Sequence, residues 1–591
     1  MKVIPVIALA TLILLVISCA DTANINYRTE PSDPDIIDKN LWEGIPAGLN
    51  GGFGTVDIAY KKSAPPLGNI SEELSLWGWI GEKVNGQFLL WSKQEVSNIS
   101  VKASDLRGES GIIEKYNIGI RLVRYVLSDE FLNGCGRRLK DTIPVHISPD
   151  MLDLFNLFGL NAMETRPIWV TVLIPENTAQ GYYSGELTVT SDTDTMVFSI
   201  GMEVTGQTLP HPADWKFHLD LWQNPYAVAR YHGVQLWSEE HWDLLKPLYR
   251  MLAESGQKCI TTTLNDMPWG GQTYDPFGSM IGWLKNTDGS WEYDYSLFDQ
   301  YVNFQMDCGI TAQINCYSMV PWNNRFRYYD QDSARFVETQ VLPGSKEYEA
   351  LWEPFLYQFR EHLREIGWLN ITTIAMDERK REEMIWIIDL IKRTVPEIKV
   401  SLAGEIQEGV DDYVYDLSIA IGNDPSREEI EARVQKGKPT TFYTCCSRPE
   451  HPNNFTFSPP ADNAIIGWYT AARGYSGFLR WAYNSWVEDP VHDSRFRTWP
   501  SGDTYLVYPG ARSSIRFERI TEGIQDYEKL RIVREKLAYN PSVNAAAFED
   551  EIEEFLSTIS LSALDVTPSA DYVNRGKELL YRISKYLTYN Q

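Results

Sequence analysis

Cysteine is scarce in this chain, and the few cysteines do not form a recognisable pattern. The 591 residues include only 7 cysteines, and no CxxC or HExxH spacing accompanies them. The six that follow Cys19 are Cys135, Cys259, Cys308, Cys316, Cys445 and Cys446. The adjacent Cys445 and Cys446 permit a metal site or a strained vicinal bridge, but no partner residues stand at metal-ligand spacing. We therefore expect unpaired, mostly buried thiols, with no metal ion and no organic cofactor.

Positive charge is also in short supply. The chain has 54 Lys and Arg against 80 Asp and Glu, which gives a formal net charge of −26. No basic cluster offsets this excess, and binding of nucleic acid depends mainly on attraction to phosphate. The composition therefore argues against nucleic acid as a partner, and solubility is the simplest role of the charge.

Long apolar runs are missing after the start of the chain. Residues 3–17 carry no charge and follow Met1-Lys2, as in a secretory signal. The run Val16-Ile17-Ser18-Cys19 resembles the lipobox of bacterial lipoproteins, which implies cleavage before Cys19 and attachment of lipid to its sulfur. We expect a lipoprotein signal peptide over residues 1–18, with an ordinary signal or an uncleaved anchor as the alternative. No second stretch of roughly 20 apolar residues follows, so the lipid should be the only membrane contact of a periplasmic or cell-surface protein.

Aromatic residues, by contrast, are abundant. The chain has 20 Trp, 32 Tyr and 22 Phe, which together make up 13% of its residues. Aromatic rings offer flat apolar faces to the C–H faces of sugars, although most rings in a protein of this size belong to its cores. This content is typical of sugar-binding proteins.

The first part of the chain has the pattern of β-strands. Strand-like runs occur at residues 87–91, 118–126, 167–174 and 185–190. Gly, Asn and Asp separate these runs, and the alternation within them predicts an antiparallel β-sandwich. We assign the sandwich to residues 19–212, with Leu209-Pro-His-Pro212 as the linker at its end.

The region 213–536 repeats one device, in which an amphipathic helix, a glycine and an apolar strand follow one another. Glycine after a helix adopts the left-handed conformation that ends it, and a short loop then leads into a strand. The predicted strands are 216–221, 260–264, 312–315, 371–376, 399–402, 416–421, 441–443 and 477–481. Eight β/α units predict a (β/α)8 TIM barrel, and a doubly wound sheet is the alternative. Residues 537–591 are predicted to form a C-terminal helical extension.

The predicted strand 371–376 leads directly into Asp377 and Glu378. Reacting groups collect at the carboxyl ends of parallel strands, because the loops there vary while the packed scaffold holds their roots. The alternative is that Asp377 caps the helix predicted over residues 379–395, since Asp is a favoured N-cap residue. We predict that Asp377 and Glu378 are catalytic.

Uncharged polar and aromatic side chains follow several of the other strands. The residues that we predict to contact a substrate are Asn224, Asn265, Tyr317, Tyr443, Trp481, Tyr483 and Trp486. Such a rim suits a neutral polyhydroxyl ligand, because aromatics stack on sugar rings and amides or phenols bond hydroxyls. The alternative for each residue is packing behind the site.

Adjacent carboxylates fit one route of glycoside hydrolysis better than the others. Neighbouring Cα atoms lie only ~3.8 Å apart, whereas inverting enzymes place their two acids ~6.5–9.5 Å apart, and ordinary retaining pairs also face each other across the sugar. If the substrate carries a 2-acetamido group, its carbonyl oxygen can attack the anomeric carbon. The protein then needs one acid and one anion that orients the acetamido N–H, and the close like charges keep the acid protonated.

Three phrases of the sequence together resemble glycoside hydrolase family 123. They are Ala375-Met-Asp-Glu-Arg379, the stretch from Arg166-Pro-Ile-Trp-Val to Gly181-Tyr-Tyr-Ser-Gly185, and Ser514-Ile-Arg-Phe-Glu-Arg-Ile-Thr-Glu-Gly-Ile-Gln-Asp-Tyr527. The resemblance implies a β-sandwich followed by a barrel, and a retaining β-N-acetylgalactosaminidase that uses substrate assistance. It further implies that Asp377 stabilises the oxazolinium and that Glu378 is the general acid/base.

The leading hypothesis is therefore an exo-acting enzyme that removes terminal β-N-acetylgalactosamine from a glycan. A second hypothesis changes the sugar, for example to β-N-acetylglucosamine or a non-acetylated glycoside. A third is a surface glycan-binding lipoprotein without catalysis, because the signal, the acidity and the aromatics alone permit it.

Overall fold

The computed structural model describes residues 30–589 except 67, 133, 137–141 and 540. The predicted signal peptide and Cys19 lie outside the described residues. Within these residues, no helix combines the length and the apolar character that crossing a membrane requires.

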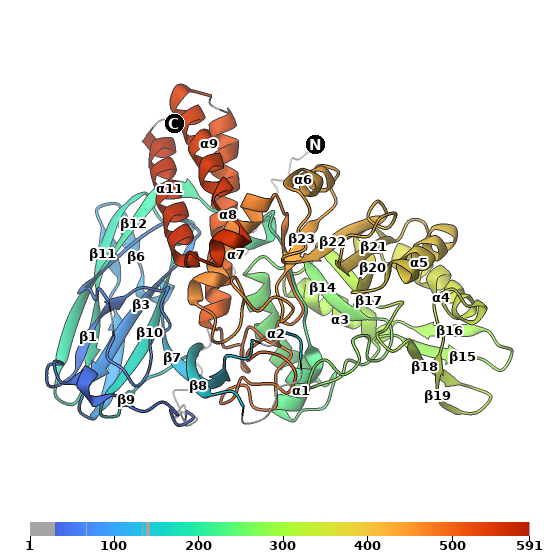
Figure 1. Ribbon diagram of the computed structural model, residues 1–591, viewed down its shortest axis with the longest axis horizontal. Coiled ribbons are helices and arrows are strands. Elements are labelled where there is room, and N and C mark those ends of the chain that lie inside the picture. Colours follow the sequence, from blue (N-terminus) through green and yellow to red (C-terminus); the bar gives the residue numbers. More distant parts are fainter. Residues whose placement is uncertain (1–29, 67, 133, 137–141, 540, 590–591) are drawn as a thin grey trace, which may run out of the picture.

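The N-terminal part is the predicted β-sandwich (Figure 1). One sheet has the order β1(Asn50–Gly54), β3(Lys83–Ser92), β10(Glu164–Leu173), β7(Ile118–Asp129), β8(Val145–Asp153). The other has the order β2(Glu73–Ile80), β12(Thr195–Thr208), β11(Gly181–Thr190), β4(Val96–Ala103), β9(Phe158–Leu160), with β5(Leu106–Gly108) and β6(Gly111–Ile113) beside it. Alternate residues such as Phe88, Ile168 and Ile200 are buried between the sheets. The pairing departs from the antiparallel prediction at one place, because β12 and β2 are parallel.

All eight predicted barrel strands are present, and they form one parallel sheet. They are β13(His218–Leu221), β14(Cys259–Thr263), β17(Gln313–Tyr317), β20(Thr372–Asp377), β21(Lys399–Gly404), β22(Val414–Ala420), β23(Thr440–Tyr443) and β24(Gly477–Arg480). The sheet order is β13-β24-β23-β22-β21-β20-β17-β14. A single parallel bridge, Leu219 to Gln257, brings β13 beside the chain entering β14, so the sheet is barrel-like.

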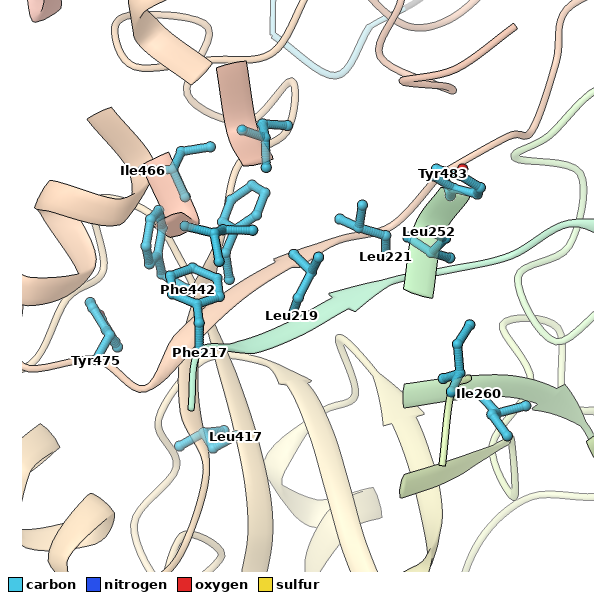
Figure 2. Close-up of a cluster of buried hydrophobic side chains, with 14 of the residues drawn as sticks. Phe217, Leu219, Leu221, Leu252, Ile260, Leu417, Phe442, Ile466, Tyr475 and Tyr483 are labelled. Atoms are coloured by element: carbon cyan, nitrogen blue, oxygen red, sulfur yellow. The ribbon is translucent and has the colours of Figure 1, made fainter. Parts of the chain in front are cut away.

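Helices surround this sheet, as the repeat predicts. They are α1(Pro225–His232), α2(Glu239–Ala253), α3(Ser296–Asp307), α4(Lys346–Glu365), α5(Arg381–Thr394), α6(Arg427–Gln435), α7(Pro460–Arg473) and α8(Ile515–Tyr539). One crossover lacks the helix of the repeat, since residues 405–413 join β21 to β22 without one. Figure 2 shows part of the hydrophobic core that the barrel strands and their helices share. Leu219 and Leu221 of β13 lie there among other buried side chains, such as Phe442 and Ile466.

Polar side chains meet inside the barrel. Asn315 donates from Nδ2 to Asp220 Oδ2 (3.0 Å) and accepts from Thr373 Oγ1 (2.7 Å). Gln313 donates to Asp416 Oδ2 across 2.6 Å. The bonds from Asn315 to Asp220 and from Gln313 to Asp416 join strands that are not neighbours in the sheet, so these two cross the interior. Layers of bulky aliphatic residues usually fill a TIM barrel, and here hydrogen bonds replace part of that packing.

Two insertions form a small sheet that the sequence did not predict. Its order is β16(Trp291–Asp294), β15(Gly282–Lys285), β18(Arg325–Asp330), β19(Arg335–Gln340). The sheet lies at the end of the barrel opposite the sandwich (Figure 1). Its strands are short and carry charged residues on their exposed face, so they lack the apolar run that marks a barrel strand.

The C-terminal helices are α9(Val543–Ser557), α10(Leu561–Leu564) and α11(Ser569–Tyr589). They tie the two halves of the molecule together, because the indole N–H of Trp79 in β2 donates to Ser584 of α11 (2.9 Å). The buried ammonium of Lys529 in α8 pairs with Glu82 at 2.6 Å. The predicted extension is therefore helical and packs against the sandwich.

The expectation of unpaired cysteines was wrong for one pair. Cys135 and Cys446 form a disulfide whose Cα atoms lie 5.0 Å apart. Cys259, Cys308 and Cys316 are free and buried. The bonded residues are 311 positions apart in the sequence, so their spacing could not reveal a bond that only the tertiary fold creates.

A buried ion pair also joins the sandwich to the barrel. Arg516, at the start of α8, contacts Asp150 of β8 at 2.8 Å, and the two side chains are 2% and 1% exposed. Its Nη1 donates to the carbonyl oxygens of Asn454, Gly502 and Tyr505 at 2.8–2.9 Å. The pair is fully hydrogen-bonded, as a buried charge requires.

We predict that Arg516→Met destabilises the protein by about 3–5 kcal/mol, because it leaves the buried charge of Asp150 without its cationic partner, with the Tyr508 hydroxyl still donating to it. The urea midpoint, followed by circular dichroism, measures this change. Arg325→Met is the matched control, since its partner Glu338 is 56% exposed and such surface pairs contribute about 0–1 kcal/mol. Equal midpoints for the two variants would contradict the prediction.

Candidate active site

The two adjacent carboxylates stand at the carboxyl end of β20, between the strand and α5. Asp377 is the last residue of the strand, and α5 is capped by Lys380 with Glu383. The alternative in which Asp377 caps this helix therefore does not hold. Glu378 has a left-handed backbone with φ +48°, an uncommon conformation for a residue with a side chain. Its N–H donates to the carbonyl oxygen of Ala403 across 2.7 Å, which fixes the turn against β21.

Each carboxylate has its own hydrogen-bond donor. Trp322, in the loop after β17, donates from Nε1 to Asp377 Oδ2 at 3.1 Å. Tyr443, the last residue of β23, donates its hydroxyl to Glu378 Oε1 at 2.9 Å. The guanidinium of Arg379 lies 5.2 Å from the ring centre of Trp322, and its Nε donates to the carbonyl oxygen of Asp377. These contacts hold the two carboxylates from different sides.

Electrostatics keep a proton on this pair near neutral pH. Burial, followed by the negative charge of Glu378, raises the pKa of Asp377 to about 7, although Arg379 and the Trp322 N–H act in the opposite direction. Burial and the Glu378 carboxylate also raise the pKa of Tyr443 far above its ordinary value. Tyr443 therefore remains a hydrogen-bond donor at any physiological pH.

The carboxylates open into an aromatic pocket with about 610 Å³ of empty space, including its mouth. Its lining residues are Cys135, Trp222, Gln272, Trp322, Asp377, Glu378, Ala403, Tyr443, Cys445, Cys446, Leu479, Trp481 and Trp499. Trp222 stacks on Trp269 with ring centres 4.9 Å apart, and Trp481 meets Trp499 edge-on at 6.0 Å. The size and the lining suit a small ligand with flat apolar faces and a few polar groups.

Of the seven residues predicted to contact a substrate, Tyr443 and Trp481 line this pocket. Tyr317 lies just behind the wall, with its ring 4.7 Å from that of Trp222.

The other four are not among its lining residues. Asn224 caps α1 by accepting from the N–H groups of residues 226 and 227. Asn265 donates to the carbonyl oxygen of Ser318. Tyr483 and Trp486 are buried, and they donate to the carbonyl oxygens of residues 248 and 507. Each of these four side chains thus makes at least one hydrogen bond to the scaffold.

Sequence reasoning missed four pocket residues that lie in loops away from the barrel strand ends, namely Gln272, Trp322, Trp499 and Cys135. Trp322 and Trp499 had one available signal, since each is a tryptophan beside a proline in a loop. These residues do not directly follow the ends of the barrel strands in the sequence. The rule that site residues directly follow a strand therefore could not predict them.

Two groups of side chains among the described residues have metal-ligand types close together. One is Cys135, Cys445 and Cys446, of which two sulfurs form the disulfide. The other is His218, Cys259 and Asp416 inside the barrel, where His218 Nε2 lies 3.1 Å from an Asp416 carboxylate oxygen. Neither group includes Asp377 or Glu378. That the site works without a metal ion stays a prediction.

Comparison with known proteins identifies the family. The family model described as "Glycoside hydrolase 123, catalytic domain" matches residues 222–533, which is more than half of the chain. The model described as "Glycoside hydrolase 123 N-terminal domain" matches residues 53–191. A comparison with curated protein sequences gives no match.

Comparison with solved structures also finds a member of this family. A family 123 glycoside hydrolase from Clostridium perfringens, whose structural analysis concerns glycolipid glycan hydrolysis, superposes with a TM-score of 0.82 at 28% identity, covering 92% of this chain and 99% of that one. A GH10 xylanase from termite gut is much less similar, with a TM-score of 0.31 at 10% identity over 61% of this chain and 90% of that one. The confirmed resemblance in both domains and the matching architecture mean that this chain belongs to glycoside hydrolase family 123.

Proposed function

We propose that this glycoside hydrolase is a retaining, exo-acting β-N-acetylgalactosaminidase that works by substrate assistance. The observation that carries the proposal is the adjacent pair Asp377 and Glu378, held by separate donors at one end of an aromatic pocket. Two carboxylates on neighbouring residues cannot flank a sugar ring on opposite faces, as ordinary inverting and retaining pairs do. The nucleophile must then come from the substrate.

The position of the proton on the pair gives each carboxylate a different role, one as the acid and the other as the orienting anion. An acetamido N–H that donates to Asp377 favours the ionised form of this residue and leaves the proton on Glu378. The acetamido carbonyl oxygen attacks the anomeric carbon while Glu378 gives its proton to the leaving oxygen, and an oxazolinium forms. Glu378, now ionised, takes a proton from the water that opens this ring. Two inversions at the anomeric carbon give net retention.

The pocket supports exo action on a terminal sugar. Its aromatic walls, including Trp222 and Trp481, offer faces on which a pyranose stacks. The choice of the galacto sugar rests on the family resemblance, and β-N-acetylglucosaminide is the alternative substrate. Glycans of glycolipids, the subject of the work on the Clostridium perfringens relative, are the first natural substrates that we would test.

The lipid anchor at Cys19 stays part of the proposal. It would hold the enzyme at a membrane, in the periplasm or at the cell surface, where it reaches its glycan substrate. Mass spectrometry of the N-terminal peptide from the native protein tests this, since a diacylglycerol on Cys19 is the expected result.

We predict that Asp377→Asn and Glu378→Gln each lower kcat/KM on 4-nitrophenyl β-N-acetylgalactosaminide by about 10²–10⁴-fold, the usual contribution of a general acid/base or a charge-stabilising group. The loss in Glu378→Gln should be larger for an alkyl glycoside, because a poor leaving group depends more on protonation. Glu382→Gln, an exposed position in the first turn of α5, is the matched control. Full activity in either active-site variant would contradict the catalytic role of that residue. Cleavage of only the β-N-acetylglucosaminide would contradict N-acetylgalactosamine as the substrate sugar.

The pH profile should report the shared proton. We expect kcat/KM to fall as pH rises through about 7, because the raised pKa of Asp377 marks the point at which the pair loses its single proton. Trp322→Phe removes a donor to the ionised form of Asp377, so it should raise this pKa and move the alkaline limb to higher pH. Trp481→Phe is the control in the same pocket. A limb that stays in place, or moves to lower pH, in Trp322→Phe would contradict this account.

Tyr443→Phe should lower kcat/KM by roughly ten- to a hundredfold, because a hydrogen bond to a charged group contributes about 1.5–3 kcal/mol. We expect the variant to handle N-acetylated substrates poorly while its thermal melting temperature changes little. Kinetics equal to those of the parent enzyme would remove Tyr443 from the site.

A further inference from the structure

The pocket wall contains three sulfur atoms, and only two of them form a bond. Cys445 is a free thiol and is partly exposed, whereas its neighbour Cys446 is bonded to Cys135. All three residues line the pocket, and their Sγ atoms lie within 4.8 Å of one another. The glycosidase mechanism uses none of them.

We propose that Cys445 is a second disulfide partner of Cys135. In this exchange the Cys445 thiolate attacks Cys135 Sγ, the Cys135–Cys446 bond breaks, and Cys446 leaves as a thiolate that takes up the proton. One disulfide and one thiol are present before and after the step, so no oxidant or reductant is needed.

The attack has two possible targets, and geometry selects Cys135. Attack on Cys446 would produce a disulfide between adjacent residues, whose Cα atoms are ~3.8 Å apart. Ordinary disulfides need about 4.4–6.8 Å between Cα atoms. A bond from Cys445 to Cys135 has no such restriction, because it joins distant segments as the present bond does.

The Cys445 side chain is held in place by its neighbours. The Ser447 hydroxyl oxygen lies 3.1 Å from Cys445 Sγ, and the N–H of Ser447 donates to the same sulfur across 3.5 Å. The backbone beside it is held, since Asn453 donates to the carbonyl oxygen of Cys445 and Arg480 donates to the carbonyl oxygen of Thr444. The thiol therefore has a defined place next to the disulfide.

The exchange should be slow at neutral pH and faster in base. Burial, followed by the charge of Asp503, raises the pKa of Cys445 to about 11 despite the bonds from Ser447. The thiolate is the attacking form, so its fraction grows about tenfold per pH unit below that pKa.

Disulfide mapping tests the exchange directly. The protein is purified without thiols, incubated at pH 7, 8 and 9, quenched in acid, alkylated with N-ethylmaleimide and digested. Fragment ions then locate the maleimide on Cys445 or on Cys446. We expect the share on Cys446 to rise with time, with an initial rate about tenfold higher per pH unit, and Cys308→Ser to behave as the parent does. A maleimide that stays on Cys445 at every pH would overturn the proposal.

A second variant removes the competing sulfur. Cys446→Ser, oxidised with glutathione disulfide, should form the Cys135–Cys445 bond completely. A folded variant, judged by circular dichroism, in which both cysteines stay free or carry glutathione would contradict the proposal. The exchange rests on the sulfur positions alone, so its failure would leave the proposed glycosidase function untouched.

Discussion

Two negative charges on neighbouring residues repel each other, and this repulsion is the constraint around which the pocket is built. Asp377 and Glu378 cannot separate along the chain, so they are held by donors that come from different strands and loops. The left-handed turn at Glu378 and its bond to β21 direct the second carboxylate toward Tyr443. Burial, together with the same repulsion, raises the pKa of Asp377 to about 7 and so retains one proton on the pair near neutral pH. A single proton on two unlike sites is what an acid and an orienting anion require.

The sandwich is part of this arrangement and not only a neighbour of it. Cys135, in the connection between β7 and β8, lines the pocket and is bonded to Cys446 of the barrel. Asp150 of β8 receives the buried Arg516 of α8, and α11 packs on the sandwich at Trp79. The disulfide fixes one part of the pocket wall from both domains, and the other two contacts hold the domains together. The active site therefore depends on the contact between the domains, and not on the barrel alone.

The sequence predicted the scaffold well because the scaffold follows local rules. Each barrel strand is a short apolar or β-branched run, and Gly474 ends α7 in the left-handed conformation (φ 77°) that the repeat requires. The same rules predicted Asp377, Glu378 and Tyr443 at strand ends. The rules were less reliable for residues beyond the strand ends. Trp481 lines the pocket as predicted, whereas Tyr483, two residues later, donates to the scaffold. Trp322 and the disulfide were not predicted, because only tertiary contacts bring them to the site.

The most direct measurement of the central claim varies the nucleophile that we assign to the substrate. Replacing the acetamido group of 4-nitrophenyl β-N-acetylgalactosaminide by mono-, di- and trifluoroacetamido groups withdraws electrons from the carbonyl oxygen without changing the sugar or the leaving group. If this oxygen attacks the anomeric carbon, kcat/KM falls steeply and in order across the series. A kcat/KM that does not change with fluorination would contradict substrate assistance and would require a nucleophile from the protein.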